Sequence, residues 1–372
     1  MEHKAHQKHV KLAKPDFGEW GRCEFALLGT VCSDIQSYAN QIKDFFLNKY
    51  AVAYIDASHS DKSTYSNFAI DATQHVDHWE LKTNPGNNMY QSKLMYFDSD
   101  IQIINGNHFT ASRQIVFLDD RKKDSLERKI DRLTDIKYII KKTVDQEIYA
   151  FLKPLMTKQT KVLLAENIIE VCDDIHFFKR ESETVNGLIL AGGKSTRMGS
   201  DKGRINYHGQ SQVEYLYTQL KQKCSQVFVS VRSDQAHDYS IPMIEDVYMN
   251  FGPMGGILSA FRYDPNSAWI TIATDLPFVS DKAIEELLSR RDKSKIATCY
   301  IKSDSEFPDP LFTIWEPKAY KSLLNFLLLG YSCPRKVLIN SDVNVVPISN
   351  DQILMNVNNP QELEMAKKII HN

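Results

Sequence analysis

The sequence predicts an α/β protein built from two domains. Its 372 residues exceed the length of one ordinary domain. Apolar runs of strand length alternate with helical segments in both halves, and in the second half several of these runs are unbroken, as buried parallel strands require. We therefore predict a flexible tail over residues 1–18, a first α/β domain over 19–180 and a second over 185–372, with charged residues at the boundary.

The first domain contains five apolar runs that we interpret as strands. They lie at residues 23–29, 50–57, 100–106, 113–120 and 135–141. Helical spacing is found over residues 38–50 and 145–156. The segment 157–183 is expected to hold the last strand or strands of this domain and the linker.

The second domain begins with the run VNGLILA at residues 185–191, which is typical of a buried central strand. Further strands are predicted at 226–231, 268–275, 295–301 and 310–315, with helices at 212–224, 255–263 and 281–291. This alternation predicts a mostly parallel sheet with helices on both faces. A last helix should start at Pro360, with Asn359 as its N-cap and Glu362 completing a capping box.

Composition limits the possible functions. Apolar residues make up 42% and charged residues 25%, and the formal net charge is -2, so no basic field indicates nucleic acid. The apolar stretches fall short of the roughly 20 residues of a membrane span, and the start of the sequence lacks the apolar core of a secretory signal. The six cysteines are far apart with no CxxC pair, which favours reduced thiols. We expect a cytoplasmic protein without nucleic-acid or membrane partners.

A glycine-rich segment follows the first strand of the second domain. It reads LILAGGKSTRMGSDKG over residues 188–203 and brings three cations, Lys194, Arg197 and Lys202, close to Gly192 and Gly193. One interpretation is a charged surface loop. The other is a cradle for a polyanion, because glycines let backbone N–H groups approach an anion and the cations hold phosphate oxygens.

This segment resembles the nucleotide-binding signature of the molybdenum cofactor guanylyltransferases, L-A-G-G-x-x-x-R-M-G-x-D-K. The matching residues are Leu190, Ala191, Gly192, Gly193, Arg197, Met198, Gly199, Asp201 and Lys202. Three later stretches resemble the same family in order and spacing: MIEDVYMNFGPMGGI at 243–257, IATDLPFV at 272–279 and NVNNPQEL at 356–363. The resemblance covers residues 185 to about 370.

The resemblance implies a Rossmann-like nucleotidyltransferase that moves GMP from GTP to the phosphate of molybdopterin or Mo-molybdopterin and releases diphosphate, with Mg²⁺ as cofactor. Molybdoenzyme apoproteins or their chaperones are possible further partners. Three alternatives stay open: a cytidylyltransferase that uses CTP on the same acceptor, transfer to another small phosphorylated acceptor, and a non-catalytic cofactor-delivery protein.

The resemblance also implies a role for each site residue. The backbone of Leu190, Ala191, Gly192 and Gly193 would meet the nucleotide. Lys202 and Arg197 would hold phosphates during catalysis. Asp275 would bind both the metal and the nucleotide, although a helix-capping role is the structural alternative. Asp246 would contact the base or ribose. The structural alternative for Asp246 is an aspartate that stabilises a turn.

One site residue departs from the family pattern, and two others have two possible interpretations. Ser230 stands where the family often has an asparagine that contacts the base, so the preference for GTP over CTP is open at this position. Arg335 and Lys336 are candidates for the acceptor phosphate, or they are simply basic residues at a helix start.

The first domain has the layout of a P-loop protein but lacks its chemistry. A working GxxxxGK[ST] loop from Gly29 would need glycine, lysine and a hydroxyl residue where the sequence has Asp34, Ile35 and Gln36. We therefore predict a degenerate P-loop that does not bind nucleotide. The domain loosely resembles the GTP-binding adaptor proteins of molybdopterin guanine dinucleotide synthesis. It would contact the transferase, a pterin intermediate or a client enzyme, or else be a structural appendage.

Overall fold

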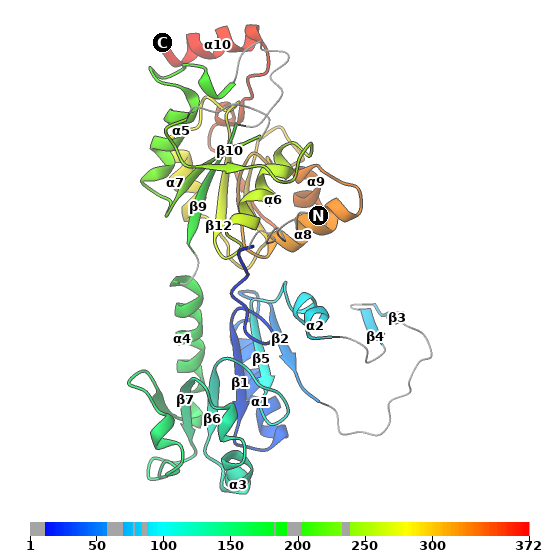
Figure 1. Cartoon of the computed structure of the whole chain (residues 1–372), viewed down its shortest axis with the longest axis vertical. Coiled ribbons are helices and arrows are strands. Elements are labelled where there is room, and N and C mark those ends of the chain that lie inside the picture. Colours follow the sequence, from blue (N-terminus) through cyan, green and yellow to red (C-terminus); the bar gives the residue numbers. More distant parts are fainter. Residues whose placement is uncertain are drawn as a thin grey trace, which may run out of the picture. The chain divides into compact units, whose positions relative to one another are not determined.

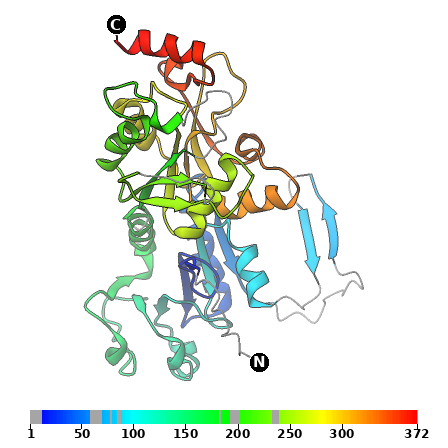
Figure 2. The ribbon, with the colours of Figure 1, turned by 45° about the horizontal axis from the view of Figure 1, so that its top comes forward.

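The computed structural model describes residues 12–57, 70–76, 79–83, 88–181, 184–191, 202–232 and 239–371. The chain divides into two compact units, Asp16–Arg180 and Glu181–Asn372 (Figures 1 and 2), and the second also takes in the N-terminal segment, of which residues 12–15 are described. Across the described ranges, no helix combines the length and the apolar character needed to span a membrane.

The unit Asp16–Arg180 is built on a parallel sheet in the order β2-β5-β1-β6-β7-β8. Its strands are β1 (Glu24–Leu28), β2 (Val52–Ile55), β5 (Ile101–Asn105), β6 (Gln114–Phe117), β7 (Ile136–Lys141) and β8 (Lys161–Leu164). An antiparallel hairpin, β3 (Ile70–Gln74) and β4 (Trp79–Thr83), lies between β2 and β5 in the sequence. All five strands predicted here are confirmed.

Helices cover both faces of this sheet. On one face, α1 (Cys32–Phe45) and α4 (Ile168–Glu181) bury Ile35, Ile42 and Val171 against the strands. The other face is covered by α3 (Lys123–Glu127) together with Tyr149 and Leu152. The short helix α2 (Met89–Met95) has a full capping box at Asn88.

Of the two helix predictions in this unit, one has shifted bounds and the other is wrong. The helix expected at 38–50 begins earlier and ends earlier, at Cys32–Phe45. The segment 145–156 forms only a 3₁₀ turn, Lys153–Leu155, because its polar side chains bind the rest of the unit instead. Gln146 Nε2 donates to the Leu118 carbonyl at 3.0 Å, and Tyr149 OH donates to Asp120 at 2.9 Å.

The second unit contains a mixed sheet in the order β11-β10-β9-β12-β14-β13-β15. Its strands are β9 (Val185–Leu190), β10 (Val227–Val231), β11 (Met243–Glu245), β12 (Ala268–Ala273), β13 (Ala297–Ile301), β14 (Phe312–Trp315) and β15 (Asn344–Pro347). Only β14 runs antiparallel to its neighbours β12 and β13. The predicted α/β fold with a mostly parallel sheet is confirmed.

Alternating side chains of β9 build two cores, one on each face of this sheet. Ile189 belongs to the core beneath α5 (Gln212–Lys221) and α7 (Asp281–Ser289). Leu188 and Leu190 belong to the core beneath α6 (Pro253–Tyr263), α8 (Ala319–Leu328) and α9 (Pro334–Ile339), on the other side in Figure 1. This period of two is the one expected of a strand buried on both faces.

The last helix, α10 (Pro360–His371), starts at the predicted residue. Glu362 N donates to the Asn359 side chain at 2.9 Å, which confirms the N-cap. The reciprocal bond of the predicted capping box differs, because the Glu362 carboxylate accepts from Asn358 N at 2.6 Å rather than from Asn359 N.

Candidate active site

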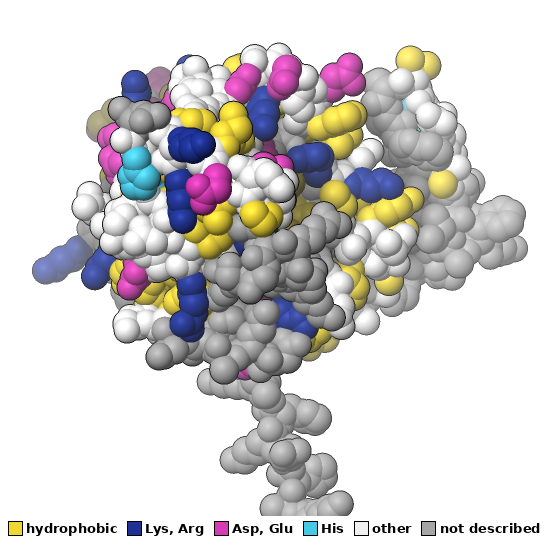
Figure 3. Space-filling view, turned by 90° about the horizontal axis from the view of Figure 1, so that it is seen from above, with side chains coloured by type: hydrophobic (Ala, Val, Ile, Leu, Met, Phe, Trp, Pro, Cys, Tyr) yellow, Lys and Arg dark blue, Asp and Glu magenta, His cyan; other side chains and the backbone are white. Residues whose placement is uncertain are grey.

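Three neighbouring strands of the second unit end at the same edge of the sheet. Leu190, the last residue of β9, pairs with Ser230 of β10 and with Ala273 of β12. The Leu190 carbonyl accepts from Thr274 N at 3.3 Å, which fixes the start of the loop that carries Asp275. The carboxyl edge of a parallel sheet is where α/β proteins bind ligands. Figure 3 looks onto the end of this unit that carries α10, where cationic and anionic side chains are interspersed.

Lys202 connects two parts of this edge. Its Nζ lies 3.7 Å from Asp275 Oδ2 and donates to Asn358 Oδ1 at 2.8 Å. Its side chain is 21% exposed, and that of Asp275 is 18% exposed. The ammonium is therefore held between a carboxylate and an amide oxygen, yet solvent still reaches it.

Only one of the two carboxylate oxygens of Asp275 has a charged partner among the described residues. Its Oδ1 is buried and has no hydrogen-bond partner among the described residues. Burial raises the pKa of Asp275; Lys202 opposes this effect, and the charge of Asp309 adds to it. A buried, unpaired carboxylate oxygen costs free energy unless a cation or donor meets it. The site therefore has the property expected of a position that receives an external cation.

Asn356 and Asn358 lie at the candidate site, although the sequence does not predict them as site residues. Asn356 Oδ1 is also buried without a described partner. The next residue, Val357, donates its N–H to the Asp275 carbonyl at 2.8 Å, so this segment lies against the end of the loop from β12. The stretch NVNNPQEL carries a family resemblance, but the sequence alone assigns no contact to its side chains.

Ser230 and Asp246 form a second, adjoining pair. Ser230 Oγ donates to Asp246 Oδ1 at 2.7 Å, and both residues are buried. Burial raises the pKa of Asp246 to about 6, although the bond from Ser230 and the charge of Arg232 lower it. The carboxylate is thus ionised at neutral pH and protonated in mild acid.

Helix α6 packs closely against this pair. A Cβ at Gly256 would lie 2.5 Å from Ser230 Oγ, so glycine is needed there for the helix to approach β10. Gly252, immediately before the helix, has φ of +56°, a conformation that residues with a side chain rarely adopt. The corner that resembles G-P-x-x-G therefore uses its glycines for backbone geometry and close packing.

The candidate acceptor residues differ in their surroundings. Both Arg335 and Lys336 are exposed in the first turn of α9. Arg335 lies within electrostatic reach of the buried Asp309, whose pKa is raised by burial and lowered by that guanidinium. The charge of Asp309 in turn raises the pKa of Asp275. Lys336 Nζ instead sits 3.6 Å from the centre of the Tyr331 ring.

The remaining predicted residues divide as follows. Leu190 and Ala191 lie at the edge, where Ala191 N donates to the Ser230 carbonyl at 3.3 Å. Gly192, Gly193 and Arg197 lie outside the described residues. The described ranges contain no group of three histidine, cysteine or carboxylate side chains that could hold a metal ion. A site with one carboxylate plus substrate phosphates fits Mg²⁺, because this ion keeps several of its waters.

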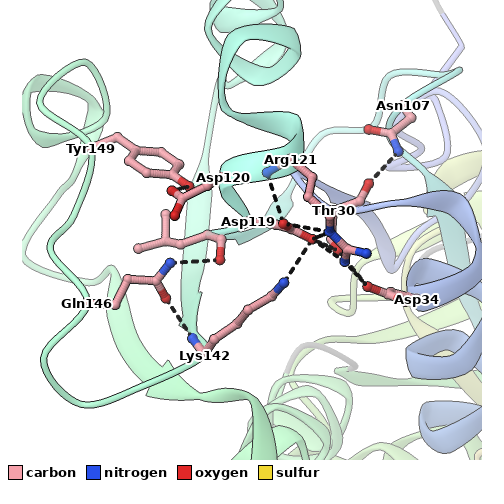
Figure 4. A network of polar contacts seen from close by, with 10 residues as sticks. Thr30, Asp34, Asn107, Asp119, Asp120, Arg121, Lys142, Gln146 and Tyr149 are labelled. Atoms are coloured by element: carbon pink, nitrogen blue, oxygen red, sulfur yellow. Dashed lines mark hydrogen bonds and ion pairs between the residues drawn. The ribbon is translucent and has the colours of Figure 1, made fainter.

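The P-loop-like turn of the first unit shows no phosphate cradle. Only Gly29, Thr30 and Val31 separate β1 from α1, so the helix starts inside the region that a P-loop would occupy. Asp34 pairs with Arg121 at 2.8 Å, and Arg121 also holds the buried Asp119, together with Lys142 at 2.9 Å (Figure 4). Arg121 and Lys142 are therefore matched by internal carboxylates.

The family comparison assigns a class to the domain that carries this edge. A family model described as the MobA-like NTP transferase domain matches residues 187–344. These residues form a MobA-like nucleotidyltransferase domain.

Several named proteins are similar to this chain. The molybdenum cofactor biosynthesis bifunctional protein of Synechocystis sp. is 36% identical over 179 residues, which are 47% of this chain and 52% of that protein. The chain thus spans about half the length of that relative. The probable molybdenum cofactor guanylyltransferase of Carboxydothermus hydrogenoformans is 27% identical over 188 residues, 49% of this chain and 94% of the relative.

Among solved structures, the molybdopterin-guanine dinucleotide biosynthesis protein A of Archaeoglobus fulgidus is 22% identical. The similarity covers 50% of this chain and 98% of that one, with a TM-score of 0.43.

Proposed function

We propose that the protein transfers GMP from GTP to the phosphate of molybdopterin and releases diphosphate. Lys202 carries the proposal, because it lies between Asp275 and Asn358 at the carboxyl edge of the sheet. Relatives named as molybdenum cofactor guanylyltransferases, 27% identical, support this acceptor and donor.

The physical problem in this reaction is the meeting of two anions. An ionised phosphate must attack the α-phosphorus of a triphosphate, so catalysis consists of positioning and charge neutralisation. Lys202 supplies a point charge whose position is fixed by its two oxygen partners. The acceptor phosphate is already ionised at neutral pH, so the site needs no general base.

Asp275 would hold Mg²⁺ through its unpartnered oxygen. Asn356 is a second candidate ligand, because its Oδ1 is also unpartnered and the next residue, Val357, bonds the Asp275 carbonyl. When bound, the ion would neutralise charge on the triphosphate and on the leaving diphosphate. Asp275 then serves as a carboxylate fixed at the strand end, where hydrogen bonds of the loop to Leu190 and Val357 orient it.

The Ser230–Asp246 pair bears on the choice of base. The Ser230 hydroxyl donates its hydrogen to Asp246, so the pair would offer only acceptor oxygens to a bound base. Guanine presents two adjacent N–H donors to a carboxylate, whereas cytosine presents one amino group. This supports GTP as donor, and CTP is the alternative because Ser230 replaces the asparagine of the resemblance.

The test offers each of the four NTPs with Mg²⁺ and molybdopterin to the full-length protein and identifies the product by mass. We expect molybdopterin guanine dinucleotide and diphosphate with GTP, and loss of product when EDTA removes the metal. A cytidine-containing product would overturn the base assignment and leave the reaction class intact. Absence of product with every NTP would favour the cofactor-delivery alternative.

A further inference from the structure

The first unit places a cysteine, a histidine and an aspartate together at the carboxyl edge of its sheet. Cys32 Sγ lies 3.4 Å from His108 Nε2, and the same nitrogen lies 3.8 Å from Asp56 Oδ1. Cys32 follows β1, Asp56 follows β2 and His108 follows β5, and these strands are neighbours in the order β2-β5-β1. This is the edge where open α/β sheets bind ligands.

We propose that Cys32, His108 and Asp56 form a nucleophilic thiol site whose substrate is a carbonyl electrophile, namely an activated ester or thioester. His108 takes the thiol proton while the Cys32 sulfur attacks the carbonyl carbon and forms a C–S bond. The bond from that carbon to the leaving oxygen or sulfur breaks, and His108 returns the proton to the leaving group. Water then hydrolyses the Cys32 thioester to a carboxylic acid and the free thiol.

The surroundings of His108 place its Nε2 between the Cys32 sulfur and the carboxylate of Asp56. Asp56 faces the ring and is itself held by Tyr54 OH at 2.7 Å and by Asn105 Nδ2 at 2.8 Å. Burial and Asp56 raise the pKa of Tyr54, and the Cys32 charge adds to this effect, so this phenol stays protonated as a donor. Burial lowers the pKa of Lys129, but the nearby Cys32 charge counteracts it, which places a cation near the sulfur.

The start of α1 supplies donors for the oxyanion that forms when sulfur attacks a carbonyl. The Val31 carbonyl accepts from Asp34 N at 3.0 Å and from Ile35 N at 3.1 Å, which are the first bonds of the helix. The N–H groups of Cys32 and Ser33 precede them and have no acceptor in the described part of the chain, since Val31 gives no side-chain cap. These two amides lie beside the nucleophile, as an oxyanion hole requires. A disulfide substrate would make no use of them.

Polar contacts fix the backbone on both sides of Cys32. Thr30 Oγ1 donates to Asp119 at 2.8 Å, and the Thr30 carbonyl accepts from Asn107 Nδ2 at 2.8 Å (Figure 4). The pair between Arg121 and Asp34 holds the first turn of α1 from the other side. A nucleophile on a rigid turn keeps its geometry without support from the substrate.

The other cysteines make the test selective. Cys172, Cys224 and Cys299 are shielded, and burial raises the pKa of each thiol to about 12. Cys23 is buried as well. Cys333 is exposed and contacts no histidine in the described ranges, so it serves as the matched control within the same molecule.

The test treats the full-length protein with p-nitrophenyl acetate and follows nitrophenolate release and the acetylated residue by mass spectrometry. We expect a burst of about one equivalent per chain, with the acetyl group on Cys32. At pH 7, Cys32 should be acylated about 10²-fold faster than Cys333, because His108 Nε2 lies 3.4 Å from the Cys32 sulfur. His108→Gln should slow acylation of Cys32 by about 10²-fold, and Cys333→Ser should leave the burst unchanged.

Equal acylation rates for Cys32 and Cys333 at pH 7 would overturn the proposal, and this comparison needs no variant to fold. An unchanged acylation rate in a folded His108→Gln protein would also overturn it, because the thiol would then react without the histidine. Alkylation or peroxide oxidation of Cys32 without any acyl transfer would show a reactive thiol of another class and would count against the carbonyl substrate.

Discussion

Each of the two sheets has an aspartate just beyond the carboxyl end of the strand next to the first strand of its unit. Asp119 is buried and Asp275 is partly buried, and their carboxylates differ in how fully they are paired. Asp119, after β6, accepts from Thr30, Arg121 and Lys142, and these bonds lower its pKa against the effect of burial. Asp275, after β12, keeps an unpartnered oxygen, and burial raises its pKa. The first carboxylate is satisfied by the fold. The second leaves part of its charge to be met by a ligand.

The largest expected effect concerns the unsatisfied carboxylate. Asp275→Asn and Lys202→Ala should each lower turnover by roughly two to three orders of magnitude, because each removes a charge contact made in the transition state. The measurement is diphosphate release with GTP and molybdopterin, together with circular dichroism to verify folding. Asp119→Asn is the matched control in the other sheet. Near-normal turnover of folded Asp275→Asn would refute its assigned role.

The satisfied carboxylate should respond in stability instead. Asp119→Ala removes the carboxylate that Arg121 and Lys142 share, although Arg121 keeps its pair with Asp34. The change should cost about 2 kcal/mol of unfolding free energy, below the value for a fully buried pair because both cations are half exposed. Urea denaturation measures this change. The wild-type contribution should be present above about pH 4 and be lost as the pH falls toward the lowered native pKa. Equal urea midpoints for variant and wild type would contradict the contrast.

Acidic pH should separate binding from stability at Asp246. Its native pKa of about 6 lies above the ordinary 3.8, so the carboxylate protonates and loses acceptors for the base as the pH falls through 6. We expect KM for GTP to rise about tenfold between about pH 7 and 5, with no such dependence in Asp246→Asn. The free energy of unfolding should change in the opposite direction. Because the native pKa is raised, ionisation of Asp246 destabilises the fold, and protonation below pH 6 should stabilise it. Steady-state kinetics against pH tests the binding part.

The smallest effect is expected from the partner of Lys202. Asn358→Ala removes the 2.8 Å bond to Nζ but leaves Asp275 in place, so turnover should fall by about tenfold or less, through positioning. Asn340→Ala is a suitable control, since Asn340 is exposed and, in the described ranges, its side-chain amide contacts only the Lys336 carbonyl. A loss as large as that of Lys202→Ala would mean that Asn358 does more than orient the ammonium.

The sequence predicts the strands well, because unbroken runs such as residues 185–190 have one stable place, inside a covered sheet. It predicts helices of the first unit poorly, because residues such as Gln146 and Tyr149 make tertiary bonds that compete with local propensity. Residue types at the candidate site could be named by resemblance. The contact of Lys202 with Asn358 could not, because it joins residues 156 positions apart and depends on the path of the folded chain.

The contact between Val357 and Asp275 has a consequence for the order of biosynthesis. A ribosome makes the strand that ends before Asp275 long before it makes Asn358 and the helix that fixes it. While that later segment is still inside the exit tunnel, Lys202 lacks one of its two anchors. A nascent chain should therefore bring Lys202 and Asp275 together first and complete the second contact of Lys202 only after Asn358 has left the tunnel.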